Sequence, residues 1–411
     1  MDAQEILILG SFGVAGYAVA FAVATALVEA LSEPWRRSVG AHWTARARLA
    51  YGPGHAVLCL SALVVPLTAA IGGVGPEILD RRLEGSMAGF WTVGMAAMAG
   101  VLTARYRWLR ELWGARVTFR TWLAGCLLMV LAGLYPILIA GLVLFLLPDM
   151  PDRRSAVMFG VAVAAVGFFA SGGNVRLLRW LGVVRPAPAS VTTMVEELAQ
   201  AMKVPGRVNV FELEWAPVNA LAWVLYRAVG FTRPLLELLS PEEIRAVAAH
   251  ELAHLIEPRW ARGLRTIHLF AYLGLVPLIK YGGIVGSVAG LLMVFALLFA
   301  YKRLSHWLEQ RADRLEREAI ADAPVYACAL SRIYEANQSP AVLPGTQSHP
   351  HLYDRLLAGG IQPAFARPPA PRRAKPLLAM AAAALLAFGL MFAMVAAAGI
   401  VLRFAQWCGF Q

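Results

Sequence analysis

Long runs of apolar residues with no charged side chain constrain this sequence more than any other feature. A helix needs about 20 mostly apolar residues to cross a bilayer. Seven segments without Asp, Glu, Lys or Arg reach that length: Ile6–Val28, Leu49–Pro76, Gly85–Ala104, Thr121–Pro148, Ser155–Val175, Tyr281–Tyr301 and Pro376–Leu402. A shorter run, Thr266–Ile279, lies between Arg265 and Lys280, whose long side chains can reach a membrane interface. We therefore predict an α-helical polytopic membrane protein with seven or eight transmembrane helices.

Composition supports a membrane environment and excludes several other classes. The 411 residues are 59% hydrophobic and 15% charged, whereas soluble domains are nearer half apolar and a quarter charged. The formal net charge is +11, but the arginines gather in short loops between the apolar runs. That placement is typical of contact with anionic lipid rather than with nucleic acid. The four cysteines form no CxxC pair, so we expect neither a disulfide framework nor a thiolate metal site.

The charge of the loops predicts which side of the membrane each polar segment faces. Two arginine-rich loops, 29–48 and 105–120, alternate with loops that have no basic excess. By the positive-inside rule, the basic loops are cytoplasmic and the N-terminus lies outside. The two long polar stretches, 176–265 and 302–375, then both fall on the cytoplasmic side. Because heavy use of alanine and arginine suggests a bacterial chain, we expect a multi-pass protein of the inner (plasma) membrane.

These features divide the chain into membrane and soluble parts. We predict an N-terminal membrane domain of five spans at residues 1–175, followed by the first part of a soluble domain at 176–265. A transmembrane helical hairpin at 266–301 separates it from the second part of the soluble domain at 302–362. A Pro- and Arg-rich linker at 363–375 then leads to a C-terminal transmembrane helix at 376–402. Within the soluble part, hydrophobic periodicity predicts a helix at Val191–Met202 and extended segments at Val208–Leu213 and Pro217–Trp223. The soluble domain should therefore be α+β.

A metal-binding motif lies on a helix whose start is clearly marked. Ser240–Glu243 reads Ser-Pro-Glu-Glu, a capping box with proline at the first helical position, and the helix should run to about Glu257. It carries the motif HExxH. Because residues four apart share a helical face, His250 and His254 can bind one zinc ion, while Glu251 can act as a general base. Histidines at this spacing can also simply pack, but the capped helix favours a metal site.

A third metal ligand must come from elsewhere in the chain. The helix that follows the run Tyr281–Tyr301 carries four acidic residues: Glu309, Asp313, Glu316 and Glu318. Glu309 and Asp313 share a face, so one can bind the metal while the other orients a ligand histidine. Interleaved arginines could instead pair with these acids on a solvated helix. The residues alone leave the third ligand open.

Taken together, the motifs resemble those of the HtpX and CAAX prenyl protease group of integral-membrane zinc metallopeptidases. After HExxH and two apolar spans, residues 309–313 read Glu-Gln-Arg-Ala-Asp, which is similar to the family's Glu-x-x-Ala-Asp. Asn219-Ala220 looks like the family's Asn-Ala beside a substrate-binding strand. Ser348-His349-Pro350, followed by Arg355, looks like its His-Pro…Arg segment. The resemblance covers residues 190–358, and the N-terminal spans match only in being hydrophobic.

The resemblance implies a gluzincin metal site with one zinc ion per chain. His250, His254 and Glu309 would be the zinc ligands, and Glu251 would be the general base. Asp313 would hold a ligand histidine through a hydrogen bond.

The resemblance also implies how the substrate is held. His349 and Arg355 would act as catalytic residues near the substrate carbonyl, and Asn219 and Ala220 would bind extended substrate by strand addition. Without the resemblance, each of these residues has a simpler interpretation: a loop histidine, an ion pair with Asp354, or a turn.

The implied function is a zinc metalloendopeptidase of the membrane. It would hydrolyse membrane-associated or misfolded membrane proteins in quality control, with the lipid bilayer and peptide substrates as partners and no nucleic acid. One alternative is a site-specific processing or signalling protease that cuts one regulatory or CAAX-type substrate. Another is a transporter or scaffold with a vestigial metal site, although the sequence has no internal repeat typical of transporters. The chain departs from the family at Leu255–Pro258, where a polar segment is common, and in its last span.

Overall fold

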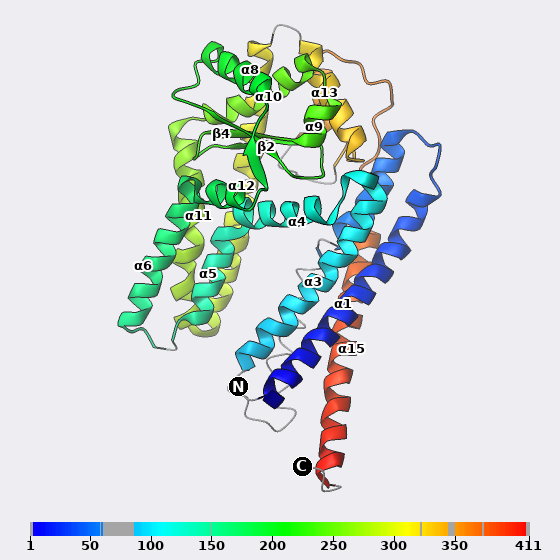
Figure 1. Cartoon of the computed structure of the whole chain (residues 1–411), viewed down its shortest axis with the longest axis vertical. Coiled ribbons are helices and arrows are strands. Elements are labelled where there is room, and N and C mark those ends of the chain that lie inside the picture. Colours follow the sequence, from blue (N-terminus) through cyan, green and yellow to red (C-terminus); the bar gives the residue numbers. More distant parts are fainter. Residues whose placement is uncertain are drawn as a thin grey trace. The chain divides into compact units, whose positions relative to one another are not determined.

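The computed structural model of the protein describes residues 3–57, 59–60, 86–148, 150–320, 323–343, 350–371 and 374–407. The chain divides into two units, each shown in Figure 1. The first comprises Met1–Ala115, Gln338–Pro344 and Pro368–Gln411, and the second comprises Arg116–Asn337 and Gly345–Arg367. These two units do not correspond to the six predicted segments, so the predicted domain boundaries stay predictions.

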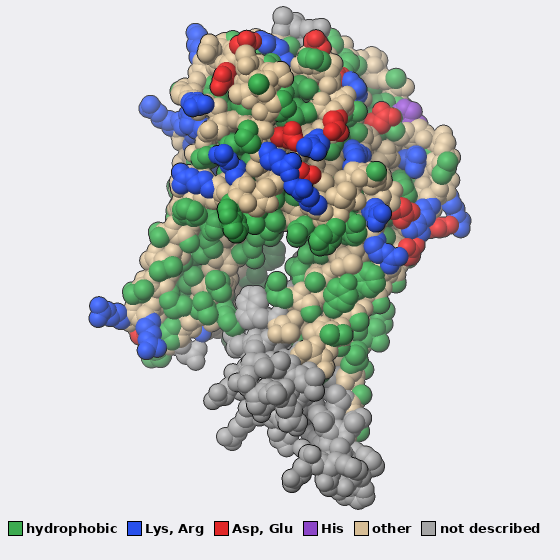
Figure 2. All heavy atoms as spheres, viewed as in Figure 1, with side chains coloured by type: hydrophobic (Ala, Val, Ile, Leu, Met, Phe, Trp, Pro, Cys, Tyr) green, Lys and Arg blue, Asp and Glu red, His purple; other side chains and the backbone are tan. Residues whose placement is uncertain are grey.

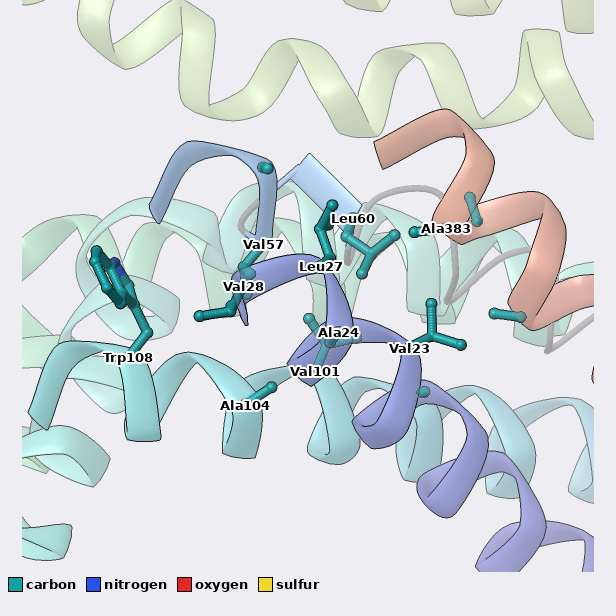
Figure 3. Close-up of a cluster of buried hydrophobic side chains, with 14 of the residues drawn as sticks. Val23, Ala24, Leu27, Val28, Val57, Leu60, Val101, Ala104, Trp108 and Ala383 are labelled. Carbon is teal, nitrogen blue, oxygen red and sulfur yellow. The ribbon is translucent and has the colours of Figure 1, made fainter. Parts of the chain in front are cut away.

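The first unit is built from long apolar helices. They are α1 (Ala3–Arg36), a helix at residues 43–57, α3 (Ser86–Trp113) with a following 3-10 turn η1 (Gly114–Arg116), and α15 (Ala374–Trp407). Gly100 of α3 lets the backbone of α1 approach closely, since a Cβ at this position would lie 2.5 Å from the carbonyl oxygen of Tyr17. Buried side chains of α1 and α3 form a core with Val57, Leu60 and Ala383 (Figure 3).

The second unit contains a four-stranded sheet with the order β1-β2-β4-β3. Its strands are β1 (Val184–Pro186), β2 (Asn209–Leu213), β3 (Ala220–Trp223) and β4 (Ala228–Thr232). β2 and β4 run parallel, while β1–β2 and β3–β4 are antiparallel pairs. The two predicted extended segments contain β2 and β3, but β1 and β4 were missed. β4 is buried along its whole length, so its sequence lacks the alternation that marks a half-exposed strand.

Helices cover both faces of this sheet. One face packs on α4 (Phe119–Leu128) and α7 (Asn174–Trp180), through Phe211, Leu213 and Trp223. The other face is covered by α8 (Ala189–Ala201) and α10 (Pro241–Leu255), as Figure 1 shows. Both helices were predicted, and α10 begins with the predicted capping box at Ser240.

A bundle of apolar helices extends from the α4 side of the sheet. It contains the π-helix η2 (Met129–Leu134), α5 (Tyr135–Leu146), α6 (Arg153–Phe168), the π-helix η3 (Phe169–Gly173), α11 (Arg259–Tyr281) and α12 (Gly283–Ala319). The remaining helices of this unit are α9 (Arg233–Leu238), α13 (Ala323–Ala336) and α14 (Leu352–Ala358). Figure 2 shows hydrophobic side chains covering α5 and α6, whereas charged side chains gather over the part that carries the sheet.

Five of the described helices are long and apolar enough to cross a membrane: Gly10–Arg36, Phe119–Leu146, Arg153–Trp180, Gly283–Ala319 and Pro376–Met394. Each overlaps a predicted span. Of the other predicted spans, Leu49–Pro76 lies mostly outside the described residues. Residues 86–104 of the predicted span Gly85–Ala104 lie in α3, and Thr266–Ile279 lies in α11. Five apolar helices are compatible with a membrane protein, and the count of seven or eight remains a prediction.

Candidate metal centre

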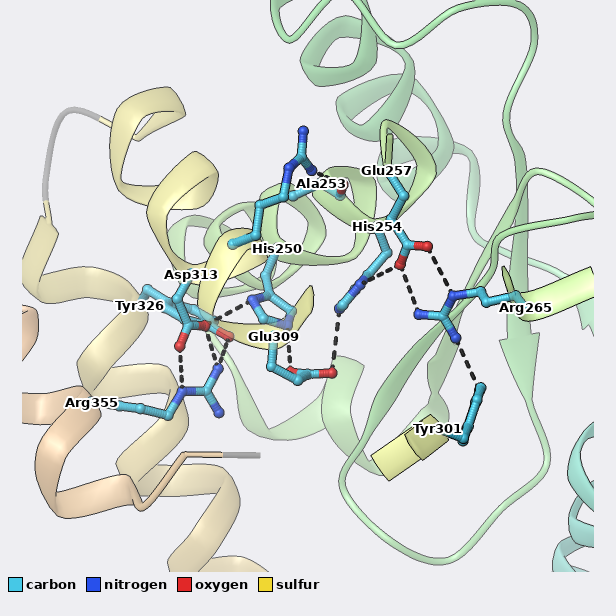
Figure 4. Close-up of polar contacts among 11 residues, drawn as sticks. His250, Ala253, His254, Glu257, Arg265, Tyr301, Glu309, Asp313, Tyr326 and Arg355 are labelled. Atoms are coloured by element: carbon cyan, nitrogen blue, oxygen red, sulfur yellow. Dashed lines mark hydrogen bonds and ion pairs between the residues drawn. The ribbon is translucent and has the colours of Figure 1, made fainter. Parts of the chain in front are cut away.

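Two helices bring the predicted metal ligands together. Ligand atoms of His250 and His254, from α10, and of Glu309, from α12, lie within 4.8 Å of one another, and all three residues are buried (Figure 4). His250 Nε2 lies 3.4 Å from Glu309 Oε2, and His254 Nε2 lies 3.5 Å from Glu309 Oε1. Glu309 is therefore the acid on α12 that faces the Nε2 atoms of both histidines.

This group of ligand atoms fits a tetrahedral metal ion. At bond lengths of about 2.0–2.2 Å, the ligand atoms around tetrahedral zinc are roughly 3.3–3.6 Å apart. The two measured separations from Glu309 fall in that range. Two imidazole nitrogens and one carboxylate also leave a fourth position for water or substrate. The residues can therefore hold a catalytic metal.

The end of α10 is fixed against α12. The last carbonyls of a helix lack partners within the helix, and Arg311 of α12 donates to two of them, Ala253 O at 3.5 Å and Ile256 O at 3.2 Å. The apolar part of α12 ends at Tyr301, and a charged part follows. Glu309 consequently lies about two turns beyond the apolar stretch.

His250 is anchored by three buried residues, Asp313, Arg355 and Tyr326, which we call the Asp313 arm (Figure 4). His250 Nδ1 lies 3.0 Å from Asp313 Oδ1. Arg355 donates from Nε and Nη2 to the two oxygens of Asp313, at 3.0 and 2.6 Å, and from Nη2 to the Tyr326 hydroxyl at 2.6 Å. The Tyr326 ring stacks on His250 with 5.3 Å between the ring centres.

The Asp313 arm sets the charge state of His250. Burial lowers the pKa of His250, but the hydrogen bonds with Asp313 and Glu309 outweigh it and raise that pKa to about 10 in the metal-free protein. Burial by itself would raise the pKa of Asp313, but Arg355 and His250 hold that pKa well below its usual value. Since a metal binds the neutral imidazole, metal binding must displace this proton.

His254 is anchored by a second set of residues, Glu257, Arg265 and Tyr301, which we call the Glu257 arm (Figure 4). His254 Nδ1 lies 3.3 Å from Glu257 Oε1. Arg265 donates two hydrogen bonds to the Glu257 carboxylate, at 2.7 and 2.8 Å, and a third to the Tyr301 hydroxyl at 3.0 Å. Burial raises the pKa of Glu257, but His254 and Arg265 bring it below its usual value. The sequence analysis missed this role, although a carboxylate three residues after His254 was a usable signal.

The predicted substrate-binding residues lie at the start of the edge strand β3. Asn219 faces β4: its N–H donates to Thr232 Oγ1 and its carbonyl accepts from the Thr232 N–H, both at 2.9 Å. The preceding residue, Val218, faces the outer edge, where the Asn337 side-chain amide accepts from its N–H at 2.9 Å and donates to its carbonyl at 2.8 Å. Peptide groups alternate in direction along a strand, so Ala220 also faces outward.

The other predicted site residues have different placements. Glu251 is buried on α10 beside His250. Arg355 belongs to the Asp313 arm and binds Asp313. Asp354, its alternative partner in the sequence analysis, binds Arg367 instead. His349 lies outside the described residues.

The remaining acids of α12 do not join the three metal ligands. Glu318 is exposed, whereas Glu316 is fully buried and burial raises its pKa to about 7. Neither carboxylate oxygen of Glu316 has a hydrogen-bond partner among the described residues.

The α+β domain has an HExxH helix, and a glutamate from a second helix completes a buried His-His-Glu group, which is the donor set of a metallopeptidase. Residues 187–358 match the family model of peptidase family M48. The match confirms the resemblance to the HtpX and CAAX prenyl protease group. No curated protein matches the chain.

Proposed function

We propose that this protein is a membrane-integrated zinc metalloendopeptidase with one zinc ion per chain. The observation that carries the proposal is the meeting of His250, His254 and Glu309, whose ligand atoms lie within 4.8 Å of one another. The M48 match supports peptide hydrolysis as the reaction. Two imidazoles and one carboxylate suit zinc, which leaves one coordination position open for catalysis.

The reaction is addition of water to a peptide carbonyl followed by cleavage of the C–N bond. A bound zinc ion lowers the pKa of water and polarises a carbonyl. Glu251 accepts a proton from the attacking water and transfers it to the leaving nitrogen as the C–N bond breaks. One water molecule is consumed, and a carboxylate and an amine are formed.

The two arms orient the histidines for this chemistry. Asp313 lies beside Nδ1 of His250, and Glu257 accepts a hydrogen bond from Nδ1 of His254, so each carboxylate directs the Nε2 atom of its histidine toward the metal position. We assign Arg355 to positioning, because its donors are engaged by Asp313 and Tyr326. His349 keeps the role implied by the family resemblance, a donor near the substrate carbonyl.

Substrate binds as an added strand on the outer edge of β3. Ala220 and Ala222 direct their peptide groups outward, and among the described residues no backbone group pairs with them. Asn337 already occupies the equivalent position at Val218, so it marks where the available edge begins. Backbone pairing of this kind accepts many sequences, which suits an enzyme that removes misfolded or membrane-associated proteins.

The active site faces the cytoplasm of a bacterial cell, at the inner membrane. Support comes from the arginine-rich loops, which by the positive-inside rule put the metallopeptidase part on that side. The apolar helices attached to the M48 domain support substrates that lie in or near the bilayer.

A comparison of two glutamates on α10 tests the proposed function. Glu251→Gln should lower cleavage of casein or of a membrane-protein substrate by about 10²–10⁴-fold, the usual contribution of a general base, while the bound zinc is retained. Glu242→Gln is the matched control, because Glu242 lies on the exposed first turn of the same helix. Chelator-sensitive cleavage by Glu251→Gln at the rate of the control would refute the assignment.

A further inference from the structure

An open pocket of about 170 Å³ lies where the β3–β4 hairpin meets the apolar helices. It is lined by Ala222 and Trp223 of β3, the following turn, both π-helices, α5, Asn174 of α7, α11 and α12. The turn is fixed in place because the Tyr226 ring lies directly on Gly172, where a Cβ would come within 2.0 Å of the ring. Gly172 also has a φ of +99°, which only glycine adopts readily.

The pocket adjoins the open edge of β3, because Ala222, whose peptide group faces that edge, is one of its lining residues. Successive side chains of an added strand point to opposite faces of the sheet. One set would point toward α10, which packs against β3 and carries the metal ligands. The other set would point toward the face where Trp223 packs, the side on which the pocket opens.

The lining selects a large apolar side chain. Tyr135, Phe169, Trp223, Tyr226 and Tyr301 supply aromatic surface, and small residues keep the space open. A cavity of about 150 Å³ is enough for one benzene ring, so this pocket holds a side chain the size of leucine or phenylalanine.

One lining residue, Arg265, connects the pocket to the Glu257 arm of the metal site. Arg265 lines the pocket and donates to Glu257, which in turn holds His254. Tyr301, another lining residue, accepts a hydrogen bond from the same guanidinium. Two residues, Arg265 and Glu257, would therefore separate a side chain in the pocket from the metal ligand His254.

We propose that this pocket is a specificity subsite, which receives a leucine- or phenylalanine-sized side chain of a substrate segment paired with the outer edge of β3. The inference rests on the proposed peptidase function and names its substrate class: polypeptides with a large apolar residue close to the cleaved bond. Segments that leave a membrane are rich in such residues.

The first test compares cleavage of peptides that carry leucine or alanine at one position, scanned across the cleavage site. The full-length protein should prefer leucine at one position by at least about tenfold in kcat/KM, within the range for apolar side-chain discrimination. Ala132→Phe fills the pocket from η2 and should reduce that preference to less than about threefold. Leu134→Phe is the matched control, because Leu134 lies on the same π-helix but does not line the pocket, and it should keep the preference. An unchanged preference in Ala132→Phe, with zinc content and thermal midpoint intact, would overturn the subsite.

A binding test separates failure of the subsite from failure of the proposed function. A set of peptides that carry a benzophenone side chain at successive positions is photo-cross-linked to the Glu251→Gln protein and the attachment sites are mapped. Attachment to residues 132, 222–226 or 269 supports the subsite even if the wild type fails to cleave, in which case only the proposed reaction is wrong. Attachment elsewhere overturns the subsite even if the wild type is an active protease.

Discussion

The two ligand histidines are held by arms of similar chemistry but different construction. In each arm a carboxylate contacts Nδ1 of the histidine, an arginine binds the carboxylate, and a tyrosine hydroxyl accepts from the arginine. The Asp313 arm draws its residues from α12, α13 and α14, whereas Glu257 follows His254 by three residues. The Arg355 side chain is 8% exposed, and that of Arg265, which lines the pocket, is 19% exposed.

The difference in construction suggests different roles: the Asp313 arm fixes His250 in the fold, whereas the Glu257 arm links His254 to the substrate pocket. The Asp313 arm joins three helices through a buried ion pair, so breaking it should affect both the fold and the metal. The Glu257 arm starts three residues after His254, continues to α11 and α12, and contacts an open pocket, so changes there should affect the metal and the substrate more than the fold. The predictions below test this contrast, from the largest expected effect to the smallest.

Asp313→Ala should have the largest effect. It leaves Arg355 buried without its carboxylate, which typically costs about 3–5 kcal/mol of unfolding free energy, and it should weaken zinc binding by about 10–100-fold. Denaturant unfolding and chelator competition measure the two effects. The control is Asp354→Ala, which removes a half-exposed ion pair with Arg367 and should cost about 1 kcal/mol or less. Equal losses in the two variants would contradict the anchoring role of the Asp313 arm.

Glu257→Ala should weaken zinc binding by about 10–100-fold but lower the unfolding free energy by only about 1–3 kcal/mol. The smaller cost is expected because Arg265 is partly exposed and keeps its hydrogen bond to Tyr301. Chelator competition and denaturant unfolding again give both values, with the exposed Glu318→Ala on α12 as a neutral control. If Glu257→Ala binds zinc as tightly as that control, the Glu257 arm does not orient His254.

Zinc affinity should fall as the pH is lowered. The pKa of His250 in the metal-free protein is about 10, so between pH 6 and 8 this histidine carries a proton that zinc must displace. The dissociation constant should therefore rise by about tenfold for each unit of decrease in pH. The same raised pKa stabilises the metal-free fold fully below about pH 6.5, and that contribution is lost as the pH rises toward 10.

The Asp313→Ala variant sharpens the test of pH dependence. Removing Asp313 takes away one of the two carboxylates that raise the pKa of His250. The plot of zinc affinity against pH should then flatten at a lower pH than in the wild type. A wild-type affinity that is independent of pH between 6 and 8 would contradict the charge state assigned to His250.

Tyr301→Phe should have the smallest effect. It removes one hydrogen bond at the end of the Glu257 arm, worth about 0.5–1.5 kcal/mol, and leaves both hydrogen bonds between Arg265 and Glu257. The unfolding free energy should fall by that amount and zinc affinity should change by less than about threefold. A tenfold loss of zinc would instead show that the arm transmits changes from the pocket to His254 more strongly than its geometry implies.

Part of the candidate site could be predicted because its signals are local. The capping box at Ser240 marks the start of α10, and the spacing of His250 and His254 puts both on one helical face. Glu309 could not be chosen from spacing, because Asp313 on the same face was an equal candidate. The family resemblance singled out Glu309, and the packing of α12 on α10 brings it to the two histidines.

Other parts of the fold and site left no readable local signal. β4 was missed because both of its faces are buried, and β1 because it is only three residues long. Asn337 pairs with Val218 across 119 positions of sequence, and a lone asparagine gives no indication of its partner.

The sequence by itself determined the apolar helices, the capped helix and the pair of histidines, because hydrophobic periodicity, capping and helical spacing all act within a few turns of chain. Only the tertiary structure decided which acid meets both histidines, that Arg355 serves Asp313, and that a pocket adjoins the open edge of β3. These contacts join residues far apart in the chain, and they exist because buried charges must find partners when helices pack.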